Sequence, residues 1–152
     1  KKDNEGKEIE MLLLLFCNVA NTTPQMISEG IRVLRENEDY DSAISVSKYN
    51  MWSPLRARKI DEEGLLKPFV PFELFGDPNT LNCDRNSQGD AWFADFGVTL
   101  VRPKCIENMN EGLLPQKWMG KRIYPLKNWG GMDVDYEWQI PQVEYWLSNT
   151  TK

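Results

Sequence analysis

The sequence predicts an α/β fold, and three consecutive segments near its start carry this prediction. Residues 9–16 (IEMLLLLF) form an apolar run interrupted only by Glu10, residues 24–37 carry apolar side chains at helical spacing, and residues 42–47 (SAISVS) have the composition of a strand. Strand and helix patterns that alternate in this way are typical of α/β proteins. With 152 residues, 41% of them hydrophobic, the chain is expected to form one globular domain.

The run at 9–16 predicts a central strand, because strands buried on both faces of a parallel sheet are continuously apolar. A buried helix segment is the alternative, which the shortness of the run disfavours. A helix is expected next, since Thr22 and Thr23 offer capping hydroxyls and Pro24 suits the first helical position. Its buried face is predicted to carry Ile27, Ile31 and Leu34.

The middle of the chain predicts a β-hairpin followed by an irregular excursion. Residues 55–60 and 65–70 flank the turn 61–64 (DEEG), whose glycine suits a left-handed backbone. Arg56 and Arg58 are expected on one face of the first hairpin strand, where they either bind phosphate or deter pairing with another chain. Residues 68–89 collect prolines, glycines and polar side chains, and long ordered loops of this kind often carry function.

The last third predicts two more strands and a closing helix. Residues 91–101 (AWFADFGVTLV) and 121–126 have strand composition, and a short helix is expected at 103–110. Gly130 and Gly131 then turn the chain toward the closing helix, in which Pro141 is tolerated only within the first turn. Apolar residues recur there at helical spacing, at Ile140, Val143 and Leu147.

The composition restricts the chemistry that this chain can perform. It contains no histidine, which excludes Ser-His-Asp and Cys-His catalysis and every zinc site with a histidine ligand. Its 23 acidic and 18 basic side chains give a net charge of −5, which disfavours nucleic acid and anionic membranes as partners. No apolar run approaches the length that spans a bilayer. We therefore expect a small-molecule partner, no nucleic acid and no membrane.

The three cysteines, Cys17, Cys83 and Cys105, are odd in number and widely spaced, and no secretory signal precedes them. This pattern predicts a reducing, cytoplasmic location. Cys17 follows the first predicted strand, where α/β sheets place ligands, but it has no base or metal partner in the sequence. We expect it to be a buried thiol.

Asp133 and Asp135 are the most specific local motif. In extended backbone, residues i and i+2 project to the same side, so the two carboxylates should converge. Such a pair suits Mg²⁺, which usually keeps several waters and completes its shell with substrate phosphates. The alternative is that Asp135 only caps the following helix.

Other candidate residues lie between residues 82 and 97. Residues 95–97 (DFG) copy a kinase tripeptide, but the other kinase motifs are missing, so the glycine is interpreted as a point of close approach. Arg85 could grip an anion or simply pair with Asp84 in solvent. Trp92 and Phe93 could stack on a sugar or base, or belong to the core, and as neighbours on one strand they should face opposite sides.

The order of these motifs resembles the acylneuraminate cytidylyltransferases, also called CMP-sialic acid synthetases, over residues 9–147. The residues that carry the resemblance are the apolar strand, the Thr-Thr-Pro helix start, residues 44–47, Ser53-Pro54 with the hairpin, Arg85, Gly97 and residues 132–135. The family fold implies a three-layer, Rossmann-like nucleotidyltransferase sheet. It also implies a protruding arm at residues 49–97 that serves homodimerisation, within a single partial domain at 1–152. The implied reaction transfers CMP from CTP to an acidic keto sugar resembling sialic acid, with release of pyrophosphate.

The resemblance also implies roles for individual residues. Asp133 and Asp135 match the family's metal-binding, catalytic Asp-x-Asp, with Mg²⁺ as the ion. Substrate contacts are implied for Arg85, Trp92 or Phe93, Gly97 and Asn18. The stretch 16–20 (FCNVA), which contains Asn18, replaces the family's Gln-Pro-Thr-Ser-Pro, so a related acidic keto sugar is as plausible as sialic acid.

The family's Arg-x-Gly-Ser-Lys loop, which holds the CTP phosphates, has no counterpart before Ile9. The chain therefore resembles the carboxyl-terminal two-thirds of the family, and we expect no turnover from it alone. Two alternatives stay open. One is transfer of another nucleotide to another sugar, and the other is a sugar- or nucleotide-binding or dimerising fragment without catalysis.

Overall fold

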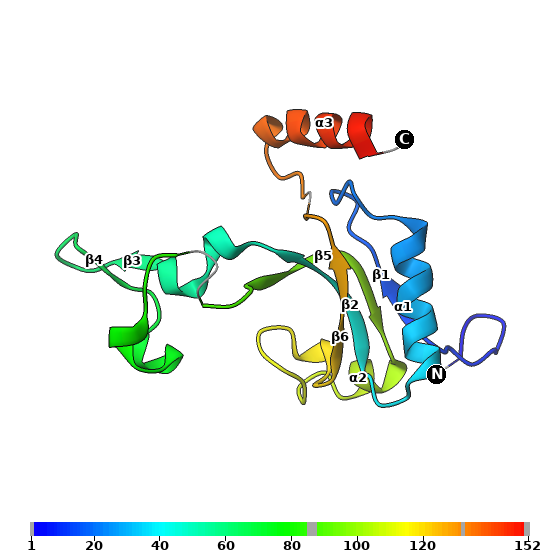
Figure 1. Ribbon diagram of the computed structural model, residues 1–152. Coiled ribbons are helices and arrows are strands. Elements are labelled where there is room, and N and C mark those ends of the chain that lie inside the picture. Colours follow the sequence, from blue (N-terminus) through cyan, green and yellow to red (C-terminus); the bar gives the residue numbers. More distant parts are fainter. Residues whose placement is uncertain (1, 85–87, 132, 151–152) are drawn as a thin grey trace. The chain divides into compact units, whose positions relative to one another are not determined.

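A computed structural model describes residues 2–84, 88–131 and 133–150 and has a mixed α/β fold (Figure 1). The chain divides into two compact units. Lys1–Ser47 and Ala94–Lys152 form the first unit, and Lys48–Phe93 forms the second, which we call the arm unit. A four-stranded sheet belongs to the first, while a separate two-stranded sheet lies in the arm unit.

The four-stranded sheet has the order β1-β5-β2-β6. Its strands are β1 (Leu12–Leu14), β2 (Ser42–Lys48), β5 (Trp92–Val101) and β6 (Ile123–Asn128). The β2 and β6 strands run parallel, whereas β1 runs antiparallel to β5. The predicted α/β class is confirmed, and the sheet is mixed rather than parallel throughout.

The prediction of a central, parallel first strand is wrong. Only Leu12–Leu14 enter the ladder, opposite Thr99–Val101 of β5, and β1 is the edge of the sheet. Its side chains are not buried on both faces, since Leu13 and Leu14 are 42% and 40% exposed. A continuous apolar run reports a tendency to be buried, but it does not specify how many neighbours the strand finds or their direction.

Helix α1 (Pro24–Glu36) begins as the sequence predicts, with Pro24 in its first turn. The Thr23 hydroxyl caps it by accepting from the N–H of Met26 at 3.3 Å. At the other end, the Arg102 guanidinium donates to the carbonyl of Tyr40 at 2.8 Å and to that of Leu34. Both ends of the helix are therefore fixed by side chains.

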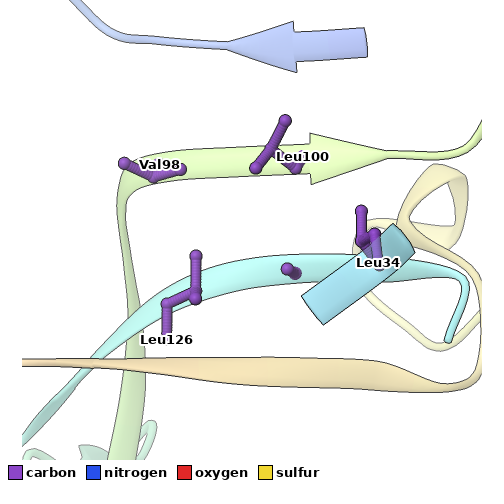
Figure 2. Close-up of a cluster of buried hydrophobic side chains, with 5 residues drawn as sticks. Leu34, Val98, Leu100 and Leu126 are labelled. Atoms are coloured by element: carbon purple, nitrogen blue, oxygen red, sulfur yellow. The ribbon is translucent and has the colours of Figure 1, made fainter. Parts of the chain in front are cut away.

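The core lies between α1 and the sheet. It consists of Leu34 from α1, Ala43 from β2, Val98 and Leu100 from β5, and Leu126 from β6, and four of these are labelled in Figure 2. The helix comes closest to the sheet at Gly30, where an added Cβ would lie 2.4 Å from the Cδ1 of Leu100. This close packing explains why the buried face of α1 carries a glycine.

Two further helices are α2 (Pro103–Glu107) and α3 (Ile140–Thr150). Pro141 falls in the first turn of α3, as predicted. Short 3₁₀ turns occupy Lys117–Met119 and Glu137–Gln139. In the described ranges, no helix has the length and apolar character needed to cross a membrane.

Asp41, just before β2, lies at the centre of a charged cluster. Its carboxylate forms an ion pair with Lys104 at 2.8 Å and accepts from the backbone N–H groups of Lys121 and Arg122 at 2.8 and 3.0 Å. Burial by itself would raise the pKa of Asp41, but the donors from these three residues outweigh it and lower the pKa to about 2. The carboxylate thus joins the start of β2 to α2 and to the segment before β6.

In the arm unit, β3 (Arg58–Ile60) and β4 (Leu66–Pro68) form the predicted hairpin, with shorter strands than the sequence suggests. Gly64 has φ +80° in the turn, which is the left-handed backbone expected there. Short 3₁₀ turns occupy Asn50–Trp52, Pro54–Arg56, Phe72–Phe75 and Pro78–Thr80. Among the described residues of the arm unit, none is buried.

Candidate metal and substrate site

Asp133 and Asp135 lie beside Asn18, which comes from the turn after β1. The Nδ2 of Asn18 donates to Oδ1 of Asp133 at 2.5 Å and to Oδ1 of Asp135 at 3.2 Å. A single amide group therefore bridges the two carboxylates. They converge on one point, as the i, i+2 spacing in extended backbone predicts.

The backbone holds this arrangement together from both sides. Val19 and Asp133 form an isolated antiparallel β-bridge, and the N–H of Val134 donates to the carbonyl of Asn18 at 2.9 Å. The buried side chain of Asn21 donates to the carbonyl of Gly130 and so anchors the turn that precedes the aspartates. The segment after β1 therefore positions Asp133 and Asp135, which lie 115 and 117 residues from Asn18 in the sequence.

Asp135 does not act as a helix cap in this structure. The backbone N–H groups of Asp135 and Tyr136 donate to the side-chain oxygen of Gln139 at 2.8 and 2.7 Å, which satisfies the start of the following turn. The Asp135 carboxylate instead accepts from Asn18. Its side chain is therefore committed to the pair with Asp133.

The pair fits an oxygen-preferring cation. Both aspartates are exposed, and an amide N–H₂ donor occupies the point between them that a cation would favour. Within the part of the chain that the structure describes, no three His, Cys, Asp or Glu side chains gather as a metal site. The protein would thus supply two carboxylates, and waters or ligand phosphates would supply the rest, as Mg²⁺ commonly requires.

A second polar cluster surrounds Asp95 on β5. One carboxylate oxygen accepts from the Ser45 hydroxyl and from the N–H of Gly97 at 3.1 Å. The other accepts from the Ser47 hydroxyl and from the Asn128 amide at 3.3 Å. Four donors from β2, β5 and β6 therefore converge on one carboxylate, which joins the three strands.

Gly97 is a point of close approach, as the sequence predicts. The Thr22 hydroxyl donates to its carbonyl at 2.7 Å. A Cβ at Gly97 would lie 3.3 Å from both the Ser45 and Thr22 hydroxyl oxygens. The neighbour is a pair of hydroxyl groups, so the glycine lets polar side chains reach the strand backbone.

The other predicted site residues are not brought to the aspartate pair by any described contact. Trp92 and Phe93 belong to the arm unit, and the Phe93 ring packs edge-on against Tyr49 with centroids 6.2 Å apart. Arg85 lies outside the described residues. The prediction that Cys17 is buried is wrong, because its thiol sits in the exposed turn after β1.

Sequence reasoning missed the roles of Asn21, Asp95, Ser45 and Ser47. The sequence held one signal, because Ser45 and Ser47 are spaced i, i+2 around the apolar Val46 and so share a face of the strand. Two buried hydroxyls on one face need an acceptor, because an unpaired buried hydroxyl is costly. Only the fold reveals that Asp95 is this acceptor.

No protein-family model matches this chain, and no curated protein matches it at a significant level.

Proposed function

We propose that this protein is a nucleotidyltransferase that joins CMP from CTP to an acidic keto sugar and releases pyrophosphate. The observation that carries the proposal is the convergence of Asp133 and Asp135 on Asn18. The order of motifs along the sequence supports the choice of nucleotide and sugar. The absence of histidine agrees with it, because phosphoryl transfer depends on positioning and charge stabilisation rather than on a histidine base.

In this reaction a hydroxyl oxygen of the sugar forms a bond to the α-phosphorus of CTP. The bond from that phosphorus to the β-phosphate oxygen breaks, and the hydroxyl proton is lost to solvent. Asp133 and Asp135 would hold Mg²⁺, which supplies neutralisation of the phosphate charge when it is bound. Asn18 orients the two carboxylates through its amide N–H groups, and its amide oxygen is left to accept a hydrogen bond from a sugar hydroxyl.

The Asp95 cluster packs against the Gly130-Gly131 turn, which precedes Asp133. An added Cβ at Gly131 would lie 2.6 Å from the Cβ of Asp95, so the Gly130-Gly131 turn packs directly against this cluster. Asn21 holds the carbonyl of Gly130 in the same turn. Two independent contacts therefore set the backbone from which Asp133 projects, and such support is what a metal or phosphate site requires.

Metal binding tests the site without requiring turnover. Calorimetric titration with Mn²⁺ is expected to show one site in the unmodified chain and at least ten-fold weaker binding in Asp133→Asn and Asp135→Asn. Glu137→Gln is the matched control, because it removes a nearby exposed carboxylate that no described contact joins to Asn18. Equal binding by all four proteins would reject the aspartate pair as a metal site.

Turnover tests the reaction itself. The natural gene product that contains these residues should release pyrophosphate from CTP and Mg²⁺ with one member of a panel of acidic keto sugars. Asp133→Asn and Asp135→Asn should abolish the release, and competition among CTP, UTP, ATP and GTP would identify the nucleotide. Metal binding without any release would favour the non-catalytic binding role.

One observation favours a second role, dimerisation through the arm unit. The arm unit has no buried residue among those described, yet it exposes many large apolar side chains. They are Met51, Trp52, Ile60, Leu65, Leu66, Phe69, Leu74, Phe75, Trp92 and Phe93. So much exposed apolar surface is unusual for a monomer and is explained by burial against a second copy of the arm.

Light scattering coupled to size-exclusion chromatography tests this role. The chain is expected to elute as a dimer, and Leu66→Asn should shift it toward monomer by removing an apolar contact that is 70% exposed in one chain. Lys67→Asn alters the neighbouring residue of the same strand and should leave the dimer intact. A monomer at high micromolar concentration would reject the proposal.

A further inference from the structure

A cavity of about 260 Å³ lies within the arm unit. Leu55, Phe72 and Leu81 form its main apolar walls, and all three are half-buried. Arg56, Arg58 and Cys83 also line it. The nucleotidyl transfer proposed above does not use this cavity, and the inference that follows does not rest on that function.

The two arginine side chains are held in place by neighbouring groups. One nitrogen of Arg58, Nη1, donates to the carbonyls of Leu55 and Ala57 at 2.7 and 3.0 Å, and its guanidinium carbon lies 5.1 Å from the Phe72 ring centroid. The Arg56 guanidinium donates to the carbonyl of Cys83. Because these contacts already order the two arginine side chains, ligand binding costs less of their conformational entropy.

Both guanidinium groups retain donors for a ligand. Each has five N–H groups, and the contacts above occupy two on Arg58 and one on Arg56. Neither arginine has a carboxylate of a described residue within ion-pair distance, although the whole chain carries a net charge of −5. The cavity therefore holds two positive charges whose neutralising anion the described chain does not supply.

We propose that this cavity binds a small organic dianion, a phosphate monoester or a dicarboxylate, whose anionic group lies between Arg56 and Arg58. Two guanidinium groups match two negative charges and offer the paired donors that phosphate and carboxylate oxygens accept. The apolar part of the ligand contacts Leu55, Phe72 and Leu81. A volume of about 260 Å³ is just below the usual range of ligand cavities, which limits the ligand to about a dozen heavy atoms.

Titration calorimetry of the full chain tests the charge and shape of the ligand. Phenyl phosphate and phthalate supply a dianion on a ring, benzoate supplies one negative charge, and benzyl alcohol supplies none. Both dianions should bind more tightly than benzoate, and benzyl alcohol should not bind detectably. Tighter binding of phenyl phosphate would identify a phosphate monoester as the preferred ligand class, and tighter binding of phthalate would identify a dicarboxylate. Equal binding of benzoate and both dianions would overturn the proposal.

Variants locate the binding. Arg56→Gln and Arg58→Gln should each weaken phenyl phosphate binding about ten-fold, as expected for loss of a charge-assisted hydrogen bond at a partly exposed site. Lys59→Gln is the matched control, because it removes the same charge from an adjacent exposed residue that does not line the cavity. Should a glutamine variant lose its circular dichroism spectrum, the Arg→Lys variant replaces it and must also bind more weakly. Equal losses in the lysine control would show that binding only follows net charge.

Cysteine alkylation provides a second readout on the same protein. Cys83 lines the cavity and is exposed, whereas Cys17 is exposed in the other unit. Saturating phenyl phosphate should slow the reaction of Cys83 with iodoacetamide at least five-fold and leave the rate at Cys17 unchanged, as followed by mass spectrometry. An unchanged rate at Cys83 would overturn the proposed location.

Discussion

Replacing Asp41 by Asn tests whether one carboxylate joins β2, α2 and the segment before β6. The Asp41 side chain is only 16% exposed, and its pKa falls from an ordinary 3.8 to about 2. A difference of that size corresponds to about 2 kcal/mol of folding free energy. Asp41→Asn should therefore lower the free energy of unfolding by about 2 kcal/mol at pH 6.

The pH dependence gives the sharper test. Because the folded-state pKa lies below the unfolded-state pKa, the contribution of Asp41 is fully present above about pH 4. It is lost as the pH falls from about 4 to about 2, where the unfolded-state carboxylate is almost fully protonated and the folded-state carboxylate is about half protonated. The difference between the unmodified chain and Asp41→Asn should thus shrink from about 2 kcal/mol at pH 6 to about 0.4 kcal/mol at pH 2.

Urea denaturation followed by tryptophan fluorescence at pH 6, 4, 3 and 2 measures this difference. Asp39→Asn is the matched control, because it removes the same charge at a position two residues before Asp41. The Asp39 carboxylate forms an exposed ion pair with Arg122 at 3.3 Å. This substitution should cost less than about 0.5 kcal/mol at every pH. A difference between the unmodified chain and Asp41→Asn that stays constant from pH 6 to 2 would refute the reasoning, as would an equal loss in Asp39→Asn.

Three further substitutions test the packing and the buried polar groups. Thr99→Val should raise the free energy of unfolding by about 1 kcal/mol, because the fully buried Thr99 hydroxyl has no hydrogen-bond partner among the described residues; an unchanged urea midpoint would contradict this. Gly30→Ala should lower it by about 1 kcal/mol, since displacing the Cδ1 of Leu100 costs more than the gain in helix propensity. A stabilised variant would show that Leu100 moves freely. Asp95→Asn should lower the free energy of unfolding by about 2 kcal/mol, because the new amide N–H₂ group faces hydroxyl and amide donors. A loss below about 0.5 kcal/mol in thermal denaturation would contradict the role of this cluster.

Local features of the chain were predictable because their causes lie within a few residues. Helix α1 depends on the Thr23 cap, on Pro24 and on apolar spacing of 3–4 residues, all of which are visible in the sequence. The hairpin turn at Gly64 and the tolerance of Pro141 in α3 follow from the backbone preferences of single residues. The alignment of Asp133 and Asp135 on one side likewise follows from extended backbone.

Only the tertiary structure decided which distant groups meet. The apolar run at Met11–Phe16 predicts a buried strand, but its pairing with β5 at the edge of the sheet depends on residues about 90 positions away. Asn18 contacts two aspartates that lie 115 and 117 residues away in the sequence, and Asp95 accepts from donors on three strands. Periodicity and propensity describe how a segment folds, whereas strand order and hydrogen-bond partners depend on which segments the whole chain brings together, because many pairings satisfy the same local pattern.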